Sequence, residues 1–389
     1  MQEKINLLAK TNMVDFAIDI HKALHGEAGE ANQALMDRRM AVVRKLHELQ
    51  ARTASIIALL KDPTKLADLS EDKQYNREHL EKAHGITENM VEALYEYAKW
   101  QYECGNYALA AEFLGVYDRL LCTSLDKVFS CLWGKLGASI LVQDFSGALA
   151  DLNRLQDMMD NKNYANPLMQ LQQRTWLLHW SLYVFFNHSN GRQLLIDLFM
   201  QDRYMNAIQI NAPYLLRYLA TVILISGKGK GLFKDLIHII KKETSNGDPI
   251  IDFLQSLYIQ YDFQLAQEKL RECEVALEND YFLVACKDEF MEHARLNIFE
   301  TYCRIHQTID IKMLAEKLNM GQEEAEKWIA NLIKNAQLNA KIDSQAGTII
   351  MHMEYPDLYD RLQSTIKDAT SRTTALAHSI LGTGESAAF

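Results

Sequence analysis

Two histidines are the residues whose type and spacing come closest to a metal site. His21 and His25 lie four residues apart, a spacing at which two imidazoles on one helix can bind zinc. A closed zinc site needs four ligands, and the neighbouring sequence offers no third, so we expect a solvated helix face. His238 and His352 stand alone on apolar elements, where packing is expected. The sequence predicts no metal and no cofactor.

Residues 226–231 look like a phosphate-binding loop that lacks its hydroxyl group. In such a loop a serine or threonine follows the lysine and holds magnesium. Glycine follows both Lys228 and Lys230 here, so a mobile loop between helices is expected. The chain also has no G-x-S-x-G, no H-E-x-x-H and no His-x-His with a spaced aspartate. Since no set of nucleophile and base can be assembled from local motifs, we predict that the protein is not an enzyme.

Composition and charge exclude several other classes. The 389 residues carry 41 basic and 51 acidic side chains, so a net charge of −10 opposes nucleic-acid binding through the global field. The 17 glycines and 5 prolines are too few for the many turns of a β-sandwich or propeller. Six cysteines without a C-x-x-C motif favour reduced thiols in the cytosol or nucleus. Neither a signal peptide nor a membrane span is predicted, since the longest apolar run, residues 218–225, is far shorter than about 20 residues.

The elements that would position any site are mainly helices. Between residues 13 and 247 apolar side chains recur every three or four residues. Two stripes are expected to pack inward, with residues 62–82 as a loop or weak helix after them. Their members are Met13, Phe16, Ile20 and Leu24 in the first, and Val42, Leu46, Leu49, Thr53, Ile56 and Leu60 in the second.

Three similar stretches indicate helical repeats. Each has a polar turn residue, an aromatic residue, and then a small residue where two helices approach. They are Asn106-Tyr107-x-x-Ala110-x-x-x-Leu114, Asp144-Phe145-x-x-Ala148-x-x-x-Leu152 and Asp262-Phe263-x-x-Ala266-x-x-x-Leu270. This pattern is typical of tetratricopeptide-like helix pairs, which stack into a solenoid that presents extended surfaces to other proteins.

The region after residue 289 predicts three helices followed by a β-hairpin, a winged-helix layout. The helices are expected near residues 290–304, 311–318 and 322–335, and the hairpin strands at 340–343 and 348–352. Residues 289–353 carry nine acidic and seven basic side chains, so protein binding is favoured over phosphate contacts. We expect the strand from Ile349 to Met351 to be a free sheet edge that a sister protein could extend, with Ile342 beside it.

A terminal helix is expected after Pro356, with a disordered tail from Gly382. Its apolar stripe consists of Leu358, Leu362, Ile366, Ala369, Leu376 and Ile380. The stripe could pack back on its own chain or bundle with helices of other subunits. We favour bundling, because the hairpin already completes the small domain.

Residues 311–320, 323–333 and 340–343 resemble a PCI domain, the module shared by the proteasome lid, the signalosome and translation initiation factor three. Upstream, Leu132-Trp133-Gly134-Lys135-Leu136 and Gln172-Gln173-Arg174-Thr175-Trp176 are similar to the e-subunit family of that initiation factor, and the similarity runs from about residue 7 to residue 351. Members of that family begin some dozens of residues earlier, so a truncated or alternative start is expected.

The resemblance implies a non-catalytic scaffold subunit without cofactors, located in the cytoplasm or also in the nucleus. The implied partners are the other PCI-type subunits of the initiation factor, the small ribosomal subunit and the scaffold protein of the cap-binding complex. Direct RNA binding through the winged helix, or membership of the proteasome lid or signalosome, are the alternatives.

The expected fold is an all-α helical-repeat solenoid of the tetratricopeptide or HEAT type. A winged-helix domain with a small β-hairpin (together the PCI module) and a C-terminal helix follow it. The expected segments are residues 1–85, 86–288, 289–353 and 354–389. The interface candidates are Ile342, Ile349, Met351, Leu358, Leu362 and Ile366.

Overall fold

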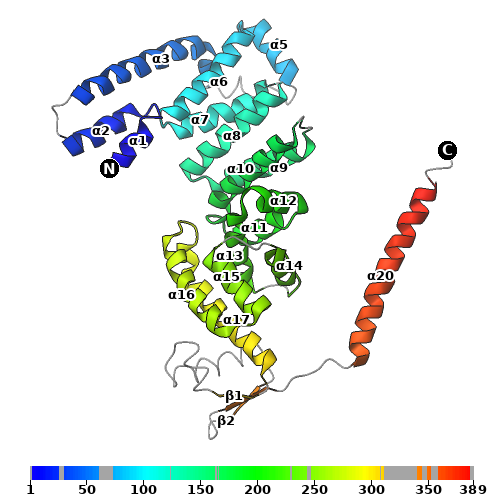
Figure 1. Cartoon of the computed structure of the whole chain (residues 1–389). Helices are drawn as coiled ribbons and strands as arrows, with labels where there is room; N and C mark the ends of the chain where they lie inside the picture. The colour runs from blue at the N-terminus through cyan, green and yellow to red at the C-terminus, as the bar shows by residue number, and fades with distance from the viewer. Residues whose placement is uncertain are drawn as a thin grey trace. The chain divides into compact units, whose positions relative to one another are not determined.

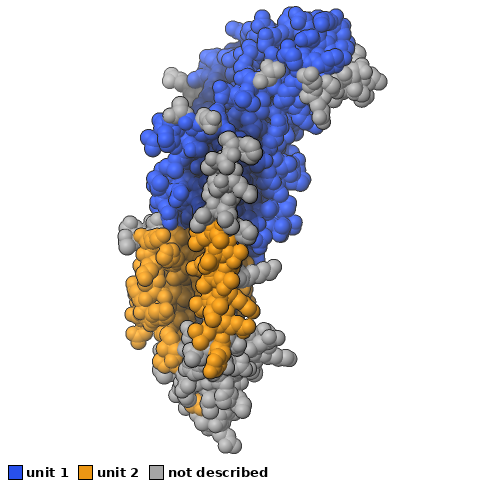
Figure 2. Space-filling model, turned by 90° about the vertical axis from the view of Figure 1, so that its right-hand side faces the viewer, with its two compact units in different colours: residues 1–222 blue, residues 223–389 orange. Residues whose placement is uncertain are grey.

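The computed structural model describes most of the chain as helices that follow one another (Figure 1). The described residues are 2–25, 30–60, 73–122, 124–162, 164, 166–227, 230–242, 247–306, 308–310, 340–343, 348–351 and 358–385. Contacts divide the chain into two units, Met1–Val222 and Ile223–Phe389, coloured separately in Figure 2. The four segments expected from the sequence remain predictions of domain organisation.

The described part of the first unit is a succession of helices. These are α1 (Gln2–Leu8), α2 (Val14–His25), α3 (Glu30–Leu60), α5 (Lys73–His84), α6 (Glu88–Glu103), α7 (Tyr107–Val116), the π-helix η1 (Tyr117–Leu121), α8 (Leu125–Val142), α9 (Phe145–Asn161), α10 (Pro167–Phe185), α11 (Gly191–Phe199), α12 (Asp202–Asn211), the 3-10 helix η2 (Pro213–Leu215) and α13 (Leu216–Ser226), which ends in the second unit. Helices α6 to α10 each pack on the next one along the chain, as in helical-repeat proteins.

The second unit contains shorter helices, a small sheet and the terminal helix. They are α14 (Lys230–Lys242), α15 (Pro249–Gln255), the π-helix η3 (Ser256–Gln260), α16 (Phe263–Asn279), the 3-10 helix η4 (Val284–Cys286), α17 (Lys287–Ile305), β1 (Thr308–Asp310), β2 (Ala340–Asp343), β3 (Thr348–Met351) and α20 (Leu358–Glu385). Helix α15 packs on α14 and α16, and α16 packs on α17. Helix α20 continues to Glu385, so the expectation of a disordered tail from Gly382 was wrong for residues 382–385.

The three repeat-like stretches begin the second helix of a packed pair, as predicted. Their small residues Ala110, Ala148 and Ala266 are completely buried. The Asp262 side chain accepts hydrogen bonds from two backbone amides in the first turn of α16, and the Asp144 side chain accepts one, from the Gly147 amide in the first turn of α9. Since a larger side chain would separate the two helices, the alanine sets their distance.

Each of these turns also contains a left-handed residue that the sequence pattern did not reveal. The residue before each polar turn residue has a positive φ: Gly105 at 93°, Gln143 at 68° and Tyr261 at 56°. In the first two turns, the backbone amides of Asn106 and Asp144 each donate to the carbonyl of the residue five positions earlier, at 2.9 Å. This is the hydrogen bond of a Schellman motif. In the third turn, the amide of Asp262 donates to the carbonyl of Ser256, six positions earlier, at 3.0 Å, because the π-helix η3 precedes this turn.

We expect Gln143→Gly to raise the free energy of unfolding by about 0.5–1 kcal/mol. Glycine adopts the left-handed region without the steric cost that a Cβ brings there, although it also loses more entropy on folding. Urea unfolding followed by circular dichroism measures the change. Gly105→Ala, at the equivalent turn, is the reciprocal control and should destabilise the protein. A lower midpoint for Gln143→Gly would contradict the prediction.

The inward stripes were predicted well for α3 and poorly for α2. In α3, Leu49, Thr53 and Ile56 are buried, and the helix packs on α6. In α2, Ile20 is buried as predicted, but Phe16 is 51% exposed and Leu24 is 39% exposed, and the buried face also contains Ala17, Ile18 and His21. The residues chosen from the sequence were the largest ones, but a small residue allows the closer helix contact.

Two further expectations need correction, and a third is settled in part. His21 is buried within α2, so it does not lie on a solvated face, while the side chain of His25 lies outside the described residues. His238 is exposed on α14 and does not pack inward; His352 lies outside the described part. Of residues 62–82, which were expected to form a loop or a weak helix, residues 73–82 belong to helix α5, in which Leu80 is buried, and residues 62–72 lie outside the described part.

No single described helix is long and apolar enough to cross a membrane. One strongly bent pair, Asp202–Asn211 with Pro213–Ser226, meets the criteria of length and composition alone.

Candidate protein-interaction site

The sheet that contains three of the predicted interface residues has three strands, in the order β1-β3-β2. Strand β3 pairs antiparallel with both neighbours: Ile349 lies opposite Ile309 on one side and opposite Ile342 on the other. The paired strands β2 and β3 occupy the segments that were predicted to form a hairpin. The two helices expected at residues 311–318 and 322–335 lie outside the described residues.

The expectation that Ile349–Met351 is a free edge was wrong. Strand β3 is central because β1 occupies its second side, and β1 was missing from the prediction. A three-residue strand, Thr-Ile-Asp, has too little alternation to be recognised in sequence. The edges of the described sheet are β1 and β2, so Ile342 is the predicted interface residue that belongs to an edge strand. The side chains of Ile342, Ile349 and Met351 lie outside the described part of the chain.

The terminal helix α20 carries the other predicted interface residues. Leu362 is 49% exposed and Ile366 is 62% exposed, and Leu376, on the same predicted stripe, is also 62% exposed. The side chain of Leu358 lies outside the described residues, although its backbone begins the helix. Three large apolar side chains open to solvent on one helix form a surface that association with another helix would cover.

An exposed aromatic surface in the first unit was not predicted. Trp176 is 50% exposed on α10, and Tyr214 is 51% exposed on η2. His179 lies on α10 one turn after Trp176, and its Nε2 is 2.6 Å from the Tyr214 hydroxyl. Tryptophan and tyrosine are enriched where proteins meet, so this surface is a further candidate for a partner. The sequence gives little signal for it, because aromatic residues on a helix usually lie in the core.

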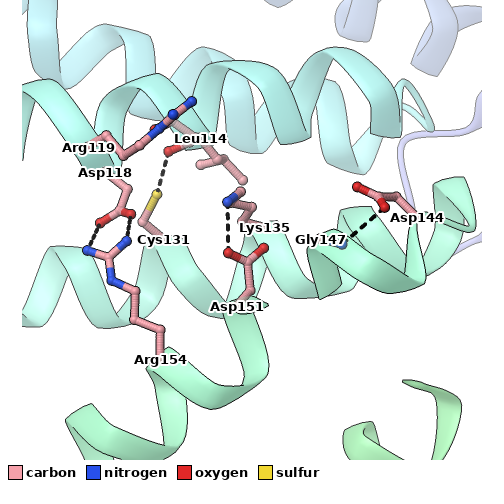
Figure 3. A network of polar contacts seen from close by, with 10 residues as sticks. Leu114, Asp118, Arg119, Cys131, Lys135, Asp144, Gly147, Asp151 and Arg154 are labelled. Atoms are coloured by element: carbon pink, nitrogen blue, oxygen red, sulfur yellow. Dashed lines mark hydrogen bonds and ion pairs between the residues drawn. The ribbon is translucent and has the colours of Figure 1, made fainter. Parts of the chain in front are cut away.

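Ion pairs join neighbouring helices of the first unit (Figure 3). The Arg154 guanidinium on α9 donates two hydrogen bonds to the carboxylate of Asp118 on η1, one of them Nη2 to Oδ1 at 3.1 Å. Lys135 on α8 donates to Asp151 on α9 at 2.7 Å. Burial is the main cause that raises the pKa of Asp151, and the Lys135 ammonium opposes this effect. The pairs join adjacent helices and therefore limit their relative movement.

The described residues do not gather into an obvious catalytic set. No group of three or more His, Cys, Asp or Glu side chains within the described part could hold a metal ion. Cys122, Cys131, Cys273 and Cys286 are buried free thiols, and Cys104 is partly buried. Burial raises the pKa of Cys131 to about 12 and also raises that of Cys273, so both thiols stay protonated and unreactive near neutral pH.

Comparison with known proteins matches both ends of the chain to family models. The model described as the eIF3 subunit 6 N terminal domain matches residues 1–101. The model described as the PCI domain matches residues 270–353, which include all three strands.

Curated relatives match nearly the whole chain. The E subunit of eukaryotic translation initiation factor 3 from Arabidopsis thaliana is 47% identical, over 98% of this chain and 89% of its own length. Proteins of the same name from Bombyx mori and Aspergillus clavatus are 43% and 41% identical, over 97% of this chain and 86% and 85% of their own lengths. The alignments therefore extend beyond residues 7–351, and they favour an initiation-factor subunit over a proteasome-lid or signalosome subunit.

Proposed function

The chain belongs to the E-subunit family of eukaryotic translation initiation factor 3, and on this basis we propose that it is a non-catalytic scaffold subunit of that initiation factor. The observation that carries the proposal is the similarity of at least 40% identity over nearly the full length to several proteins of this one name. In this proposal the protein associates in the cytoplasm with sister PCI-type subunits. It thereby helps to recruit messenger RNA to the small ribosomal subunit and contacts the scaffold protein of the cap-binding complex.

Association would use two elements of the second unit. The first is the outer side of β2, where Ile342 lies, because it is an edge of the described sheet and backbone groups at an edge can pair with a strand of another subunit. The predicted winged helix would surround this edge. The second is α20, whose exposed Leu362, Ile366 and Leu376 fit a bundle with helices of other subunits. Ile349 and Met351 would support the edge from the central strand.

We expect the double substitution Leu362→Glu with Ile366→Glu to release the protein from its complex while the chain stays folded. Burying two carboxylates in an apolar helix bundle costs several kcal/mol, so recovery of sister subunits should fall at least about tenfold. The measurement is affinity purification of the tagged full chain, with quantitative mass spectrometry of the sister subunits.

The matched control is Gln363→Glu with Ser371→Glu, which adds the same charge to exposed positions of α20 away from the stripe. The control should retain the sister subunits. Unchanged recovery for the first variant would show that α20 is not an interface. Equal loss for both variants would show that charge on the helix, rather than its apolar stripe, controls association.

A further inference from the structure

Helix α14 has one apolar side and one strongly basic side. Leu236 and Ile240 are completely buried, and the ring of Phe233 packs edge-on against Tyr258 with centroids 4.8 Å apart. These contacts fix the rotation of the helix against α15 and η3, its neighbours in the second unit. The opposite side is consequently held toward solvent.

The exposed side carries four basic groups, which we call the basic face: Lys234, His238, Lys241 and Lys242. A helix rises about 1.5 Å per residue, so positions 234, 238 and 242 follow one another at intervals of about 6 Å on one side. Asp235 is exposed at the margin of this face and is its one described carboxylate within α14. The sequence places two more lysines, at positions 228 and 230, directly before or at the start of the helix.

The three lysines of the basic face form no ion pair within the described part of the chain. Other lysines of the same unit do: Lys269 lies 2.7 Å from Glu272, and Lys287 lies 2.6 Å from Glu278. Helix α14 contains four lysines and one aspartate, a local net charge of +3 in a chain with a net charge of −10. Such a concentration of unneutralised charge is attracted to a polyanion.

The basic face lacks the features of a protein interface. No large apolar side chain is exposed among residues 231–242. Protein interfaces are centred on aromatic and apolar side chains and are depleted in lysine. Nucleic-acid backbones, in contrast, are bound mainly by lysine and arginine through their phosphates, without sequence selection. The composition of the face therefore favours a nucleic-acid backbone over an acidic protein.

We propose that the basic face of α14 binds the phosphate backbone of RNA. The choice of RNA rather than DNA rests on the proposed function in translation. The site is distinct from β2 and α20, which the proposed function uses for association with sister subunits. The contact is electrostatic, so it selects for the backbone and not for a base sequence, and it weakens as salt rises.

The test is a fluorescence-anisotropy titration of the purified full chain with a fluorescein-labelled oligouridylate of about 20 nucleotides, at several salt concentrations. For the triple variant Lys234→Ala, Lys241→Ala and Lys242→Ala, the slope of log K against log salt should become shallower by about 2, since each phosphate contact contributes about 0.7. At about 50 mM salt the affinity should fall at least about tenfold. All three side chains are exposed, so the fold should be unaffected.

The matched control is Lys22→Ala, Lys99→Ala and Lys367→Ala, which removes the same charge from exposed positions on other helices. It should bind within about twofold of the natural chain. Equal weakening of both triple variants, or absence of binding by the natural chain, would overturn the proposal. Binding of a labelled polyglutamate peptide, without any binding of the oligouridylate, would also overturn it and would assign the face to an acidic protein.

A second readout separates this proposal from the proposed function. Recovery of sister subunits with the α14 variant should equal that of the natural chain. If the variant instead loses those subunits, the basic face is a protein interface and the RNA proposal fails, although the proposed function stands.

Discussion

Replacing Gly191 with alanine is expected to lower the free energy of unfolding by about 3–5 kcal/mol. A Cβ at this position would lie 1.7 Å from the carbonyl oxygen of Phe185 and 2.5 Å from its carbonyl carbon. Both are backbone atoms, so no side chain can rotate away and the turn between α10 and α11 would have to shift. That turn joins two core segments, since Phe185, Leu195 and Phe199 are all buried. Urea unfolding of the full chain measures the loss.

Gly231→Ala is the matched control for this prediction. A Cβ at Gly231 would meet nothing within 4 Å, and the residue lies in the first turn of α14. Alanine is the better helix former by up to about 1 kcal/mol, so a neutral or slightly stabilising effect is expected. Similar unfolding midpoints for the two alanine variants would mean that the close approach at Gly191 does not exist.

Arg154→Met is expected to lower the free energy of unfolding by about 3–5 kcal/mol, more than Asp118→Asn or Lys82→Met, which also remove one charge from an ion pair. The side chain of Asp118 is only 1% exposed, whereas that of Arg154 is 42% exposed. Removing the arginine leaves a buried carboxylate without its counter-ion. Asp118→Asn should cost less, about 1–2 kcal/mol, because the guanidinium that remains can reach water. Urea unfolding of the single and double variants yields their coupling energy.

The surface pair of Lys82 and Glu78 is the control for this series. Both side chains are more than half exposed, and Lys82→Met is expected to change stability by less than about 0.5 kcal/mol. The account of the buried pair fails if Arg154→Met costs no more than Lys82→Met, or if Asp118→Asn costs more than Arg154→Met.

The helical repeats were predictable because their signal is local. The aspartate before α9 or α16 accepts hydrogen bonds from backbone amides two or three residues later. One turn further on, Ala148 or Ala266 lies where two helices approach closely. Both effects act within about two turns of one helix, so the sequence pattern contains them. The left-handed Gln143 escaped prediction because glycine, not glutamine, is the usual signal at that position.

The position of the sheet edge was not predictable in the same way. Ile309 lies opposite Ile349, which is forty positions further along the chain. The three residues of β1 contain no local pattern from which this pairing could be predicted. The same limitation explains Phe16, which was expected to be buried but is about half exposed. In the first case a long-range pairing decided which strand is central, and in the second the packing of α2 decided which of its sides faces inward.

The sequences of α20 and α14 show that both helices are amphipathic. They do not show which side chains remain exposed to solvent in the folded chain. An apolar stripe predicts that something covers it, and only the structure shows that Leu362 and Ile366 remain open to solvent within this chain. His238 was expected to pack inward because its neighbours are apolar, yet the helix turns it to the exposed side with the lysines.

The central claim is that this protein acts as part of a multi-subunit initiation factor. Sedimentation of a cell extract on a density gradient tests it most directly, with the tagged full chain and the sister PCI subunits quantified in every fraction. The account predicts that the chain sediments together with those subunits, far ahead of its own mass of 44.7 kDa, and in near-equal amount. Sedimentation as a free 44.7 kDa chain, or together with proteasome-lid subunits, would contradict it.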